Sequence, residues 1–338
     1  MRSSTAETPR RSRWCSTTPD VALVTAGNPK RRTGGNLYNR HMLAALRRDG
    51  IRVRTVVLRG RRDAAMSLGK LRAPLVLVDT IVASLAAPHL SRLRARGSEV
   101  VALALMQQGA MALARRADRT IAVGRSLAAE LVAGGIDRRR IVVISPGRDR
   151  LAAGSRDRRG GRILCVANWT TGKGIHTLVA AVARVPGVSL DLVGDAPDAA
   201  YAVRVRRAIK AYGLGSRVHV YGALGRAAVE RRYAAASVFA LPTIREGYPI
   251  AYVEALAHGL PIVGCDIPAV REVTGGAAIL VAPGRVAPLA AALKRLVTDE
   301  RARRALASRS LSRARLLPTW SESEARFVRA VRSRRAVV

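Results

Sequence analysis

The sequence predicts an α/β protein built from two doubly wound domains, and three observations lead to this prediction. At roughly 150 residues per domain, its 338 residues suggest two domains. Hydrophobic residues make up 49% of the chain and aromatic residues only 4%, so the apolar supply is mainly Ala, Val and Leu, which suits parallel strands buried between helices. Short apolar runs also alternate with amphipathic stretches, as in repeated strand–helix units. These features argue against an all-β sandwich.

The first domain is expected over residues 20–150. Its first strand is followed by a helix over 34–50, because Leu37, Met42 and Leu46 recur at helical spacing and Gly50 ends the pattern. The strands are expected where apolar runs stand between polar segments, over 21–27, 53–58, 74–80, 99–106, 119–124 and 141–147.

A second series of strands begins after a polar, charged run, in which we place a linker at 151–161. The second domain is expected over 162–317, with strands at 162–169, 190–195, 218–222, 237–243, 261–266 and 277–283. Two Rossmann-like domains of this kind face a central cleft, and ligands bind beyond the carboxyl ends of their strands. Residues 318–338 are expected to form a C-terminal helix that crosses back to the first domain.

The basic charge of the chain is high but evenly spread. It has 59 basic residues, of which 54 are Arg, against 23 acidic ones, giving +36, and residues 1–150 hold 29 of the basic and 10 of the acidic residues. A dedicated nucleic-acid arm would concentrate the charge in one block. A field this positive still attracts phosphates, nucleic acid and anionic membranes.

The location of the protein is expected to be cytoplasmic. Residues 1–19 lack the apolar core of a signal peptide and are expected to be a disordered basic lead-in. No span of about 18 uncharged apolar residues is present. The three cysteines, Cys15, Cys165 and Cys265, are too far apart for a redox pair and indicate a reduced compartment. The positive charge adds the expectation of a peripheral position at the inner face of the membrane.

The most informative segment is REGYPIAYVEALAHGLPIV, residues 245–263. Glu246 falls in the loop after a strand, Pro249 suits the start of a helix and Gly259 suits its end. The first backbone amides of that helix, at Ile250 and Ala251, suit a phosphate, and a carboxylate in the loop before them can accept hydrogen bonds from sugar hydroxyls. One turn deeper, Glu254 could hold a ribose diol. The alternative is structural: a helix-start Glu and a half-buried Glu in a satisfied network.

This segment resembles the GT-B glycosyltransferases of the retaining family-4 type, the glycosyl transferases group 1. Their hallmark is two Glu eight residues apart followed by a stretch like the Ala-Leu-Ala-His-Gly-Leu-Pro-Ile-Val of residues 255–263. The similarity extends from about residue 20 to 330. It implies that Glu246 contacts the donor sugar and that Glu254 contacts the nucleotide ribose.

Two further segments share this resemblance. VANWTTGKGIHTLVAA, residues 166–181, is similar to the family's stretch in which a Lys-Gly at a helix start meets the donor diphosphate, and this implies that role for Lys173. Taken alone, Lys173 would be an ordinary surface lysine. Gly34 and Gly35 resemble the glycine pair whose amides approach the donor phosphates and the acceptor.

Two positions depart from the family pattern. Asn168 stands where the family usually has an Arg, so this position can donate hydrogen bonds but carries no charge. Gln107 and Gln108 stand where members often have a His beside the reaction centre, and amides exchange no proton at neutral pH. Either the protein dispenses with that group, or its activity is altered or lost.

The resemblance therefore implies a retaining, hexosyltransferase-like enzyme that moves a sugar from a nucleoside-diphosphate sugar to a hydroxyl acceptor. The positive charge of the chain adds the expectation of a lipid or cell-envelope glycan as the acceptor. The implied enzyme needs no metal and no cofactor other than the donor substrate. Glu246 and Lys173 are the expected catalytic residues, and Gln107 and Gln108 are candidates for the acceptor side. The donor-binding residues are expected to be Gly34, Gly35, Asn168, Lys173, Gly247, Tyr248, Pro249, Ile250, Ala251 and Glu254.

Two alternatives stay open. A GT-B-like protein that binds a nucleotide sugar with little or no turnover is suggested by Gln107, Gln108 and Asn168. A basic nucleic-acid-binding protein is suggested by the charge of +36 alone. An NAD-dependent enzyme is disfavoured because no G-x-G-x-x-G follows the first strand.

Overall fold

The computed structural model of the chain describes residues 18–31, 33–149, 151 and 161–333. The expected lead-in, apart from residues 18 and 19, lies outside the described residues. So do most of the expected linker and the last residues of the expected C-terminal helix.

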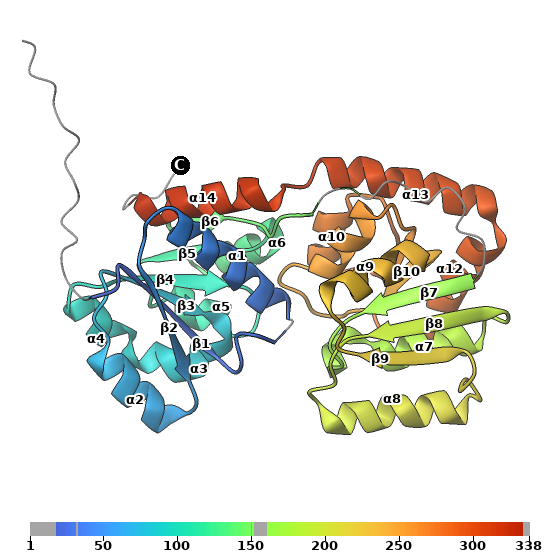
Figure 1. The fold of residues 1–338 in the computed structure, drawn as a ribbon, viewed down its shortest axis with the longest axis horizontal. Helices are drawn as coiled ribbons and strands as arrows, with labels where there is room; N and C mark the ends of the chain where they lie inside the picture. Colours follow the sequence, from blue (N-terminus) through green and yellow to red (C-terminus); the bar gives the residue numbers. More distant parts are fainter. Residues whose placement is uncertain (1–17, 32, 150, 152–160, 334–338) are drawn as a thin grey trace, which may run out of the picture.

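The first domain contains a parallel sheet of six strands in the order β2-β1-β3-β4-β5-β6 (Figure 1). The chain therefore changes direction across the sheet between β1 and β3. The strands are β1 (Val21–Ala26), β2 (Val53–Leu58), β3 (Leu75–Asp79), β4 (Glu99–Ala104), β5 (Arg119–Ala122) and β6 (Ile141–Val143). The α-helices are α1 (Gly34–Arg48), α2 (Arg61–Lys70), α3 (Ala83–Ala86), α4 (Leu90–Ala95), α5 (Ala110–Ala114) and α6 (Arg125–Ala133).

Helix α1 shows how the local sequence builds this domain. The Thr33 side chain accepts a hydrogen bond from the Asn36 N–H and caps the helix start. Tyr38, Met42 and Leu46 then recur at helical spacing and are fully buried. The capped start leaves the loop between β1 and α1 at the carboxyl edge of the sheet.

The second domain contains another parallel sheet of six strands, in the order β12-β11-β10-β7-β8-β9, and here the chain changes direction between β7 and β10. The strands are β7 (Gly161–Val166), β8 (Val188–Val193), β9 (Val218–Gly222), β10 (Val238–Leu241), β11 (Ile262–Cys265) and β12 (Ile279–Val281). The α-helices are α7 (Ile175–Ala183), α8 (Ala199–Ala211), α9 (Arg226–Ala235), α10 (Ile250–Ala257), α11 (Pro268–Thr274), α12 (Val286–Thr298) and α13 (Glu300–Arg315). The predicted α/β fold with two doubly wound parallel sheets is confirmed.

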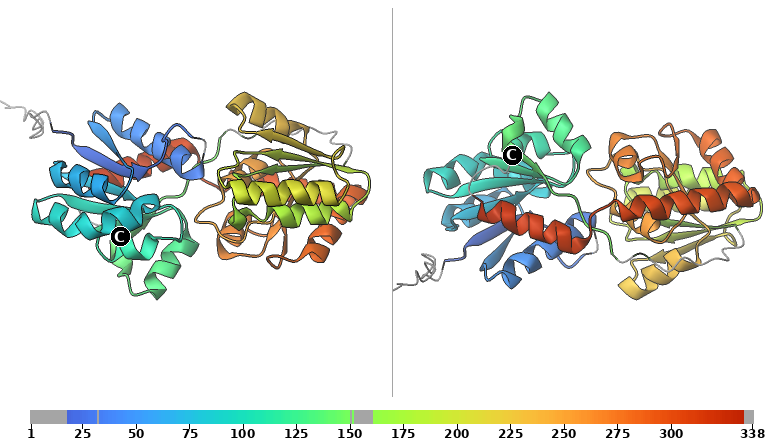
Figure 2. Two further views of the ribbon diagram at one scale, coloured as in Figure 1. Left: turned by 90° about the horizontal axis from the view of Figure 1, so that it is seen from below. Right: turned by 90° about the horizontal axis from the view of Figure 1, so that it is seen from above.

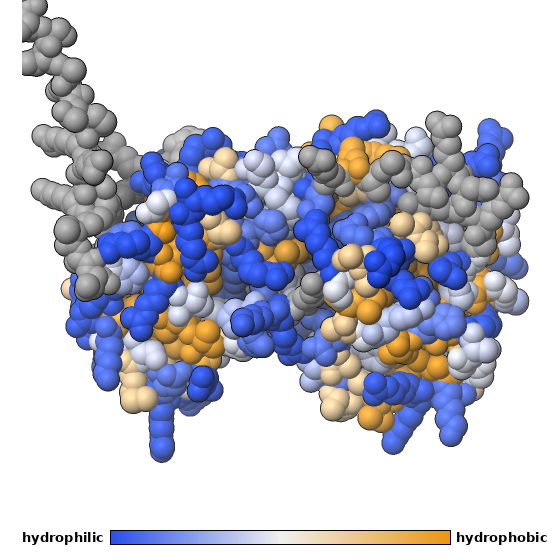
Figure 3. Space-filling model, in the orientation of Figure 1, coloured by the Kyte–Doolittle hydropathy of each residue, from blue (hydrophilic) through white to orange (hydrophobic). Residues whose placement is uncertain are grey.

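The two domains lie side by side, and the last two helices run along one edge of the molecule over both of them (Figures 1 and 2). Helix α14 (Trp320–Arg332) lies on α1, where the Trp320 ring stacks on His41 with 3.8 Å between ring centroids. Phe327 meets Tyr38 edge-on at 6.2 Å. On the edge away from α13 and α14, the surface is hollowed between the domains (Figure 3). No helix of the described residues is long and apolar enough to cross a membrane.

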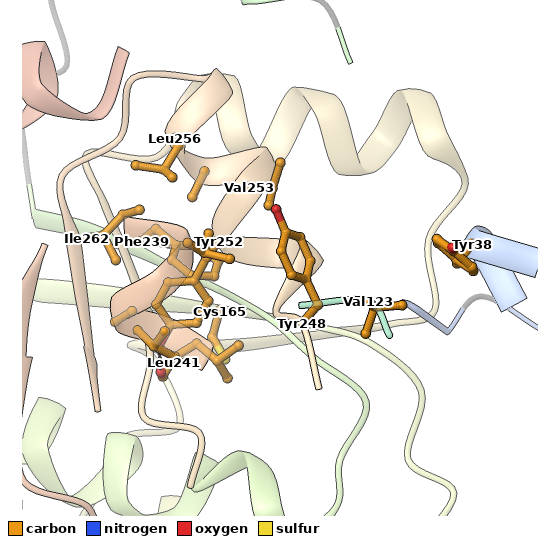
Figure 4. Close-up of a cluster of buried hydrophobic side chains, with 14 of the residues drawn as sticks. Tyr38, Val123, Cys165, Phe239, Leu241, Tyr248, Tyr252, Val253, Leu256 and Ile262 are labelled. Carbon is orange, nitrogen blue, oxygen red and sulfur yellow. Dashed lines mark hydrogen bonds between the residues drawn. The ribbon is translucent and has the colours of Figure 1, made fainter. Parts of the chain in front are cut away.

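Buried aromatic side chains hold α10 on the second sheet (Figure 4). Tyr252 of α10 packs against Phe239 of β10, with 5.4 Å between the ring centroids, and its hydroxyl donates to the Leu241 carbonyl. Cys165 of β7 belongs to the same buried cluster, and burial raises the pKa of its thiol to about 12. This packing fixes the first turn of α10 at the carboxyl edge of the sheet.

Candidate functional site

The loops that follow β7 and β10 meet where the strand order of the second sheet reverses. The Ile244 N–H and the Thr243 hydroxyl both donate to the Gly172 carbonyl, at 2.8 and 3.1 Å. Gly174 has a φ of +64°, and a Cβ there would lie 2.3 Å from the Pro242 carbonyl oxygen. Because only glycine tolerates both the backbone angle and the close approach, this position allows the two loops to touch.

This contact brings Lys173 and Glu246 together. The Lys173 Nζ lies 2.5 Å from Glu246 Oε1, and the Thr243 hydroxyl donates to the same oxygen at 3.0 Å. The Lys173 side chain is 26% exposed and that of Glu246 10% exposed, so a ligand can reach the ammonium from the solvent side. An ammonium suits phosphate oxygens, and a carboxylate beside it suits the hydroxyls of a sugar.

Glu254 lies on α10 among different neighbours. Its Oε2 accepts a hydrogen bond from the Tyr233 hydroxyl of α9 at 2.8 Å. Burial raises the pKa of the Glu254 carboxyl to about 7, the Tyr233 bond opposes that rise, and the negative charges of Asp149 and Glu230 add to it. The nearby Arg226 favours the charged form. The structure therefore joins Glu246 with Lys173, whereas it gives Glu254 a half-buried position with other neighbours.

The first turn of α10 provides one open amide. The Ile250 N–H donates to the Tyr248 carbonyl at 3.1 Å, so the expectation of a free amide at Ile250 is wrong. The tight turn through the N-cap residue Pro249 folds that amide back on the loop. The Ala251 N–H has no acceptor among the described residues and lies at the positive end of the helix dipole.

The first domain approaches this turn closely. Gly34 lies opposite Ile250 of the second domain, whose Cδ1 is 3.5 Å from the position that a Gly34 Cβ would take. A Cβ at Gly35 would lie 3.6 Å from Cδ1 of Leu105, in the first domain itself. Gly247 is more confined, because a Cβ there would lie 2.2 Å from the Leu105 carbonyl oxygen. Glycine is therefore needed at Gly247, whereas Gly34 and Gly35 have room for a Cβ atom.

Tyr248 takes part in the same contact between domains. It lies between Val123 of the first domain and the cluster around Tyr252 (Figure 4). Its side chain hydrogen-bonds with Ser145, and burial raises the pKa of its hydroxyl. Its ring is buried, so the structure places it in the packing next to the expected donor site.

The positions that depart from the family pattern have defined partners. Gln107 and Gln108 are exposed in the loop between β4 and α5, and the Gln107 amide donates to Glu130 Oε1 at 2.7 Å. Asn168 Oδ1 accepts a hydrogen bond from the Asp195 N–H at 3.1 Å. Asn168 therefore holds the backbone of the loop after β8.

The structure adds residues that the sequence reading missed. The Arg31 guanidinium of the first domain pairs with Asp195 of the second. The Glu272 carboxylate of α11 accepts hydrogen bonds from the Arg125 and Ser126 amides of α6, at 2.7 and 2.8 Å. The basic run 30–32, just before the glycine pair, was a signal for Arg31. Glu272 gave no such signal.

Acidic and imidazole side chains do not gather as they would around a metal. Among residues 18–31, 33–149, 151 and 161–333, no group of three or more His, Cys, Asp or Glu side chains is placed to hold a metal ion.

Two doubly wound domains with a charged pair at the reversal of the second sheet define a GT-B architecture. Two solved structures share it over almost their whole length, although at a sequence identity that supports the fold alone. Sucrose-phosphate synthase from Thermosynechococcus elongatus superposes with a TM-score of 0.80 and 20% identity, covering 92% of this chain and 98% of that one. HepE from Anabaena, in complex with UDP and glucose, superposes with a TM-score of 0.74 and 18% identity, covering 92% and 99%.

The family-model match falls on the second domain. Residues 160–299 match the family model of the glycosyl transferases group 1, the family that the motifs of this chain resemble. The MMP alpha-(1->4)-mannosyltransferase of Mycolicibacterium hassiacum is 32% identical over 175 residues, which are 49% of this chain and 42% of that protein. The 2-deoxystreptamine N-acetyl-D-glucosaminyltransferase of Streptomyces fradiae is 33% identical over 126 residues, 36% and 29% of the two chains. The chain thus spans less than half the length of these curated relatives.

Proposed function

We propose that this chain is a glycosyltransferase that moves a sugar from a nucleoside-diphosphate sugar to a hydroxyl group. The observation that carries the proposal is the Lys173–Glu246 pair, half-buried at the reversal of the second sheet. Such a reversal is where doubly wound sheets bind ligands.

Each group at this edge has a part in the proposed reaction. Lys173 bonds an oxygen of the leaving diphosphate, together with the Ala251 N–H at the start of α10. Glu246 accepts hydrogen bonds from hydroxyls of the donor sugar, and Glu254 accepts them from the ribose. Catalysis then consists of positioning the reactants and of stabilising the charge that develops on the diphosphate.

We propose further that the reaction retains the configuration of the sugar, a hexose, and that it needs neither a metal nor a cofactor. The bond from the anomeric carbon to the phosphate oxygen breaks, and a bond to the acceptor oxygen forms on the same face. The proton of the acceptor hydroxyl passes to the departing phosphate oxygen. The names of the two relatives support sugar transfer, and the HepE complex with UDP and glucose supports the class of donor.

The acceptor side of the proposal rests on the first domain. The exposed Gln107 and Gln108 are suited to hydrogen-bond acceptor hydroxyls. Because the chain carries a net charge of +36, we propose an acceptor on an anionic surface, such as a lipid or a cell-envelope glycan, reached by peripheral association from the cytoplasm. Co-sedimentation with anionic but not with neutral vesicles is the expected result, and equal sedimentation with both would contradict this part.

The central experiment is a thermal-shift screen of UDP, GDP and their sugars, followed by product analysis with a broad mixture of hydroxyl acceptors. A ligand of the native state raises the melting temperature. We expect one diphosphate series to do so and its sugar to yield a transfer product. Absence of any shift would contradict the proposed donor class.

The second candidate is a nucleotide-sugar-binding protein with little or no turnover. It is favoured by one observation, the hydrogen bond that ties Gln107 to Glu130 where the family often has a proton-exchanging His. A clear thermal shift with a nucleotide sugar but no hydrolysis or transfer product would support it.

A basic nucleic-acid binder is the third reading, motivated by charge alone. Binding that falls steeply with added salt and shows no preference for sequence would reflect electrostatics only. Specific affinity for one nucleic acid would favour this reading over sugar transfer.

A further inference from the structure

The loop between β1 and α1 reaches across to the second domain through Arg31. The Arg31 Nε donates to Asp195 Oδ2 at 3.0 Å, and Nη2 donates to the same oxygen. Asp195 follows β8, so this ion pair joins the two domains. The side chains of Arg31 and Asp195 are 42% and 44% exposed, and the guanidinium lowers the pKa of the Asp195 carboxyl.

The partner of Arg31, in the loop after β8, is hydrogen-bonded to the β7 loop, which carries the expected donor-binding residues Asn168 and Lys173. The Asp195 N–H donates to Asn168 Oδ1 at 3.1 Å, and the Asp195 carbonyl accepts from the Trp169 N–H at 2.7 Å. Lys173 lies four residues further along this β7 loop. The guanidinium is therefore anchored beside the segment that ends in the Lys173 ammonium.

The other end of the β1–α1 loop reaches the opposite side of the site. Gly34, three residues after Arg31, faces Ile250 at the start of α10. The loop thus runs from the end of β8 to the start of α10. The loops of β7 and β10, which carry Lys173 and Glu246, belong to the strands between these two points in the sheet order.

Charge balance at this edge calls for a second cation. A nucleoside-diphosphate sugar carries two negative charges on its phosphates, whereas the single charge of Lys173 is already paired with Glu246. The guanidinium of Arg31 presents a planar fork that matches two phosphate oxygens. An exposed ion pair such as Arg31–Asp195 is worth only about 0–1 kcal/mol, so exchanging it for a phosphate is easy.

We propose that Arg31 is a donor-binding residue. Its guanidinium gives up the ion pair with Asp195 and binds the diphosphate on the side opposite Lys173. This inference rests on the proposed function. It means that the first domain, and not position 168 of the second, supplies the second positive charge of the diphosphate site. It also means that the diphosphate is held by both domains at once. The competing reading is a purely structural latch, in which Arg31 only joins the domains.

The two readings differ in what happens when Asp195 loses its charge. In Asp195→Asn the guanidinium is released from its carboxylate but stays in place, so a diphosphate binds as tightly as in the wild type or more tightly. A latch would instead be broken equally by Arg31→Ala and by Asp195→Asn. The two variants therefore have different expected effects only if Arg31 binds the ligand.

The experiment is calorimetric titration of the full-length protein with UDP, UMP, GDP and GMP. For the base that binds, we expect Arg31→Ala to weaken diphosphate binding by about 10-fold or more and monophosphate binding much less, with Arg31→Lys in between. Arg47→Ala, which removes one exposed charge at the end of α1, is the matched control and should bind like the wild type. Thermal unfolding checks that each variant is folded.

Three outcomes would overturn the inference. If Arg31→Ala and Asp195→Asn weaken diphosphate binding equally, Arg31 is a structural latch. If Arg31→Ala binds the diphosphate as the wild type does, Arg31 has no role in binding. In both cases binding by the wild type still supports the proposed function. Failure of the wild type to bind any of the four nucleotides would overturn both together.

Discussion

The two domains share one architecture but use the reversal point of their sheets differently. In the first domain the reversal lies at β1 and β3, where Asp79, 4% exposed, accepts hydrogen bonds from Thr25 at 3.2 Å, Asn39 at 2.8 Å and the Ile81 N–H at 3.0 Å. In the second domain it lies at β7 and β10, where Lys173 and Glu246 stay partly exposed.

This difference indicates a division of labour. The bonding capacity of Asp79 is used by its own domain, which ties together the end of β1, helix α1 and the end of β3 and so fixes the loop that presents Gly34 and Arg31. Burial raises the pKa of the Asp79 carboxyl, as expected for a group that serves structure. The charged pair of the second domain has solvent on one side and can exchange its partners for a ligand. Under the proposed function, the edge of the first sheet positions its loop and the edge of the second sheet binds the donor.

The largest effect is expected when the binding edge is broken. Lys173→Ala and Glu246→Gln should each lower sugar transfer by about 100-fold or more, because each removes a charged contact to the donor. Lys210→Ala, at an exposed lysine of α8, is the matched control and should keep wild-type turnover. Transfer is measured as product formed, with thermal unfolding as the test of folding. Unchanged turnover in both site variants would refute the assignment.

The next largest effect is expected at the positioning edge. Asp79→Ala leaves the Asn39 amide and the Ile81 N–H without their acceptor, so the free energy of unfolding should fall by about 3 kcal/mol. Denaturant unfolding measures it. Asp266→Ala, which removes an exposed carboxylate paired with Arg271, should cost less than about 1 kcal/mol. Equal losses in the two variants would show that the Asp79 network has no special weight.

The strands of both domains were predictable because apolar runs between polar segments are a local property of the chain. The ends of these runs were less certain. The run 99–106 continues past the end of β4 at Ala104. The Leu105 side chain lies against Gly35 of its own domain, and it is the backbone of Leu105 and Met106 that approaches Gly247 of the second domain. The order of strands, which differs between the domains, depends on crossovers that leave no local pattern.

The candidate site was predictable where its residues belong to one segment or motif. The strand, glycine and proline context singled out Glu246 and Glu254, and the resemblance to a family motif singled out Lys173. The contacts of Arg31 with Asp195 and of Glu272 with Arg125 join residues 164 and 147 positions apart. Charges that pair at such separations follow no period, so only the folded chain reveals them.

A third prediction tests whether the second domain also holds a carboxyl group whose ionisation is disfavoured by burial. The Glu254 carboxyl has a pKa of about 7 in the folded chain, against an ordinary value of 4.5. Between these values the folded state binds more protons than the unfolded state, so stability falls as the pH rises through this window. The shift corresponds to at most about 3 kcal/mol.

Glu254→Gln removes this titration. The melting temperature of the variant should therefore rise relative to that of the wild type as the pH rises from 4.5 to 7.5. Glu300→Gln, an exposed residue at the start of α13, should show no such gain. Melting curves at closely spaced pH values give the answer. A constant difference between Glu254→Gln and the wild type would mean that the Glu254 pKa is the same in the folded and the unfolded chain.

The smallest effect on stability is expected at the contact of Glu272 with α6, which helps to hold the two domains facing each other. Glu272 of α11 caps α6 of the other domain, whereas Asp198 caps α8 within its own domain by accepting from the Tyr201 N–H at 3.0 Å. Glu272→Ala and Asp198→Ala remove similar bonds, and each should lower the free energy of unfolding by about 1 kcal/mol.

Of these two variants, Glu272→Ala should separate the domains and Asp198→Ala should not, because only the first removes a bond between the domains. Small-angle scattering should therefore show a larger radius of gyration for Glu272→Ala and an unchanged one for Asp198→Ala. Glu272→Gln, which keeps one acceptor oxygen, should lie between Glu272→Ala and the wild type. If Glu272→Ala and the wild type scatter alike, the domains are held facing by the packing around Tyr248 and α14, and the cap contributes stability alone.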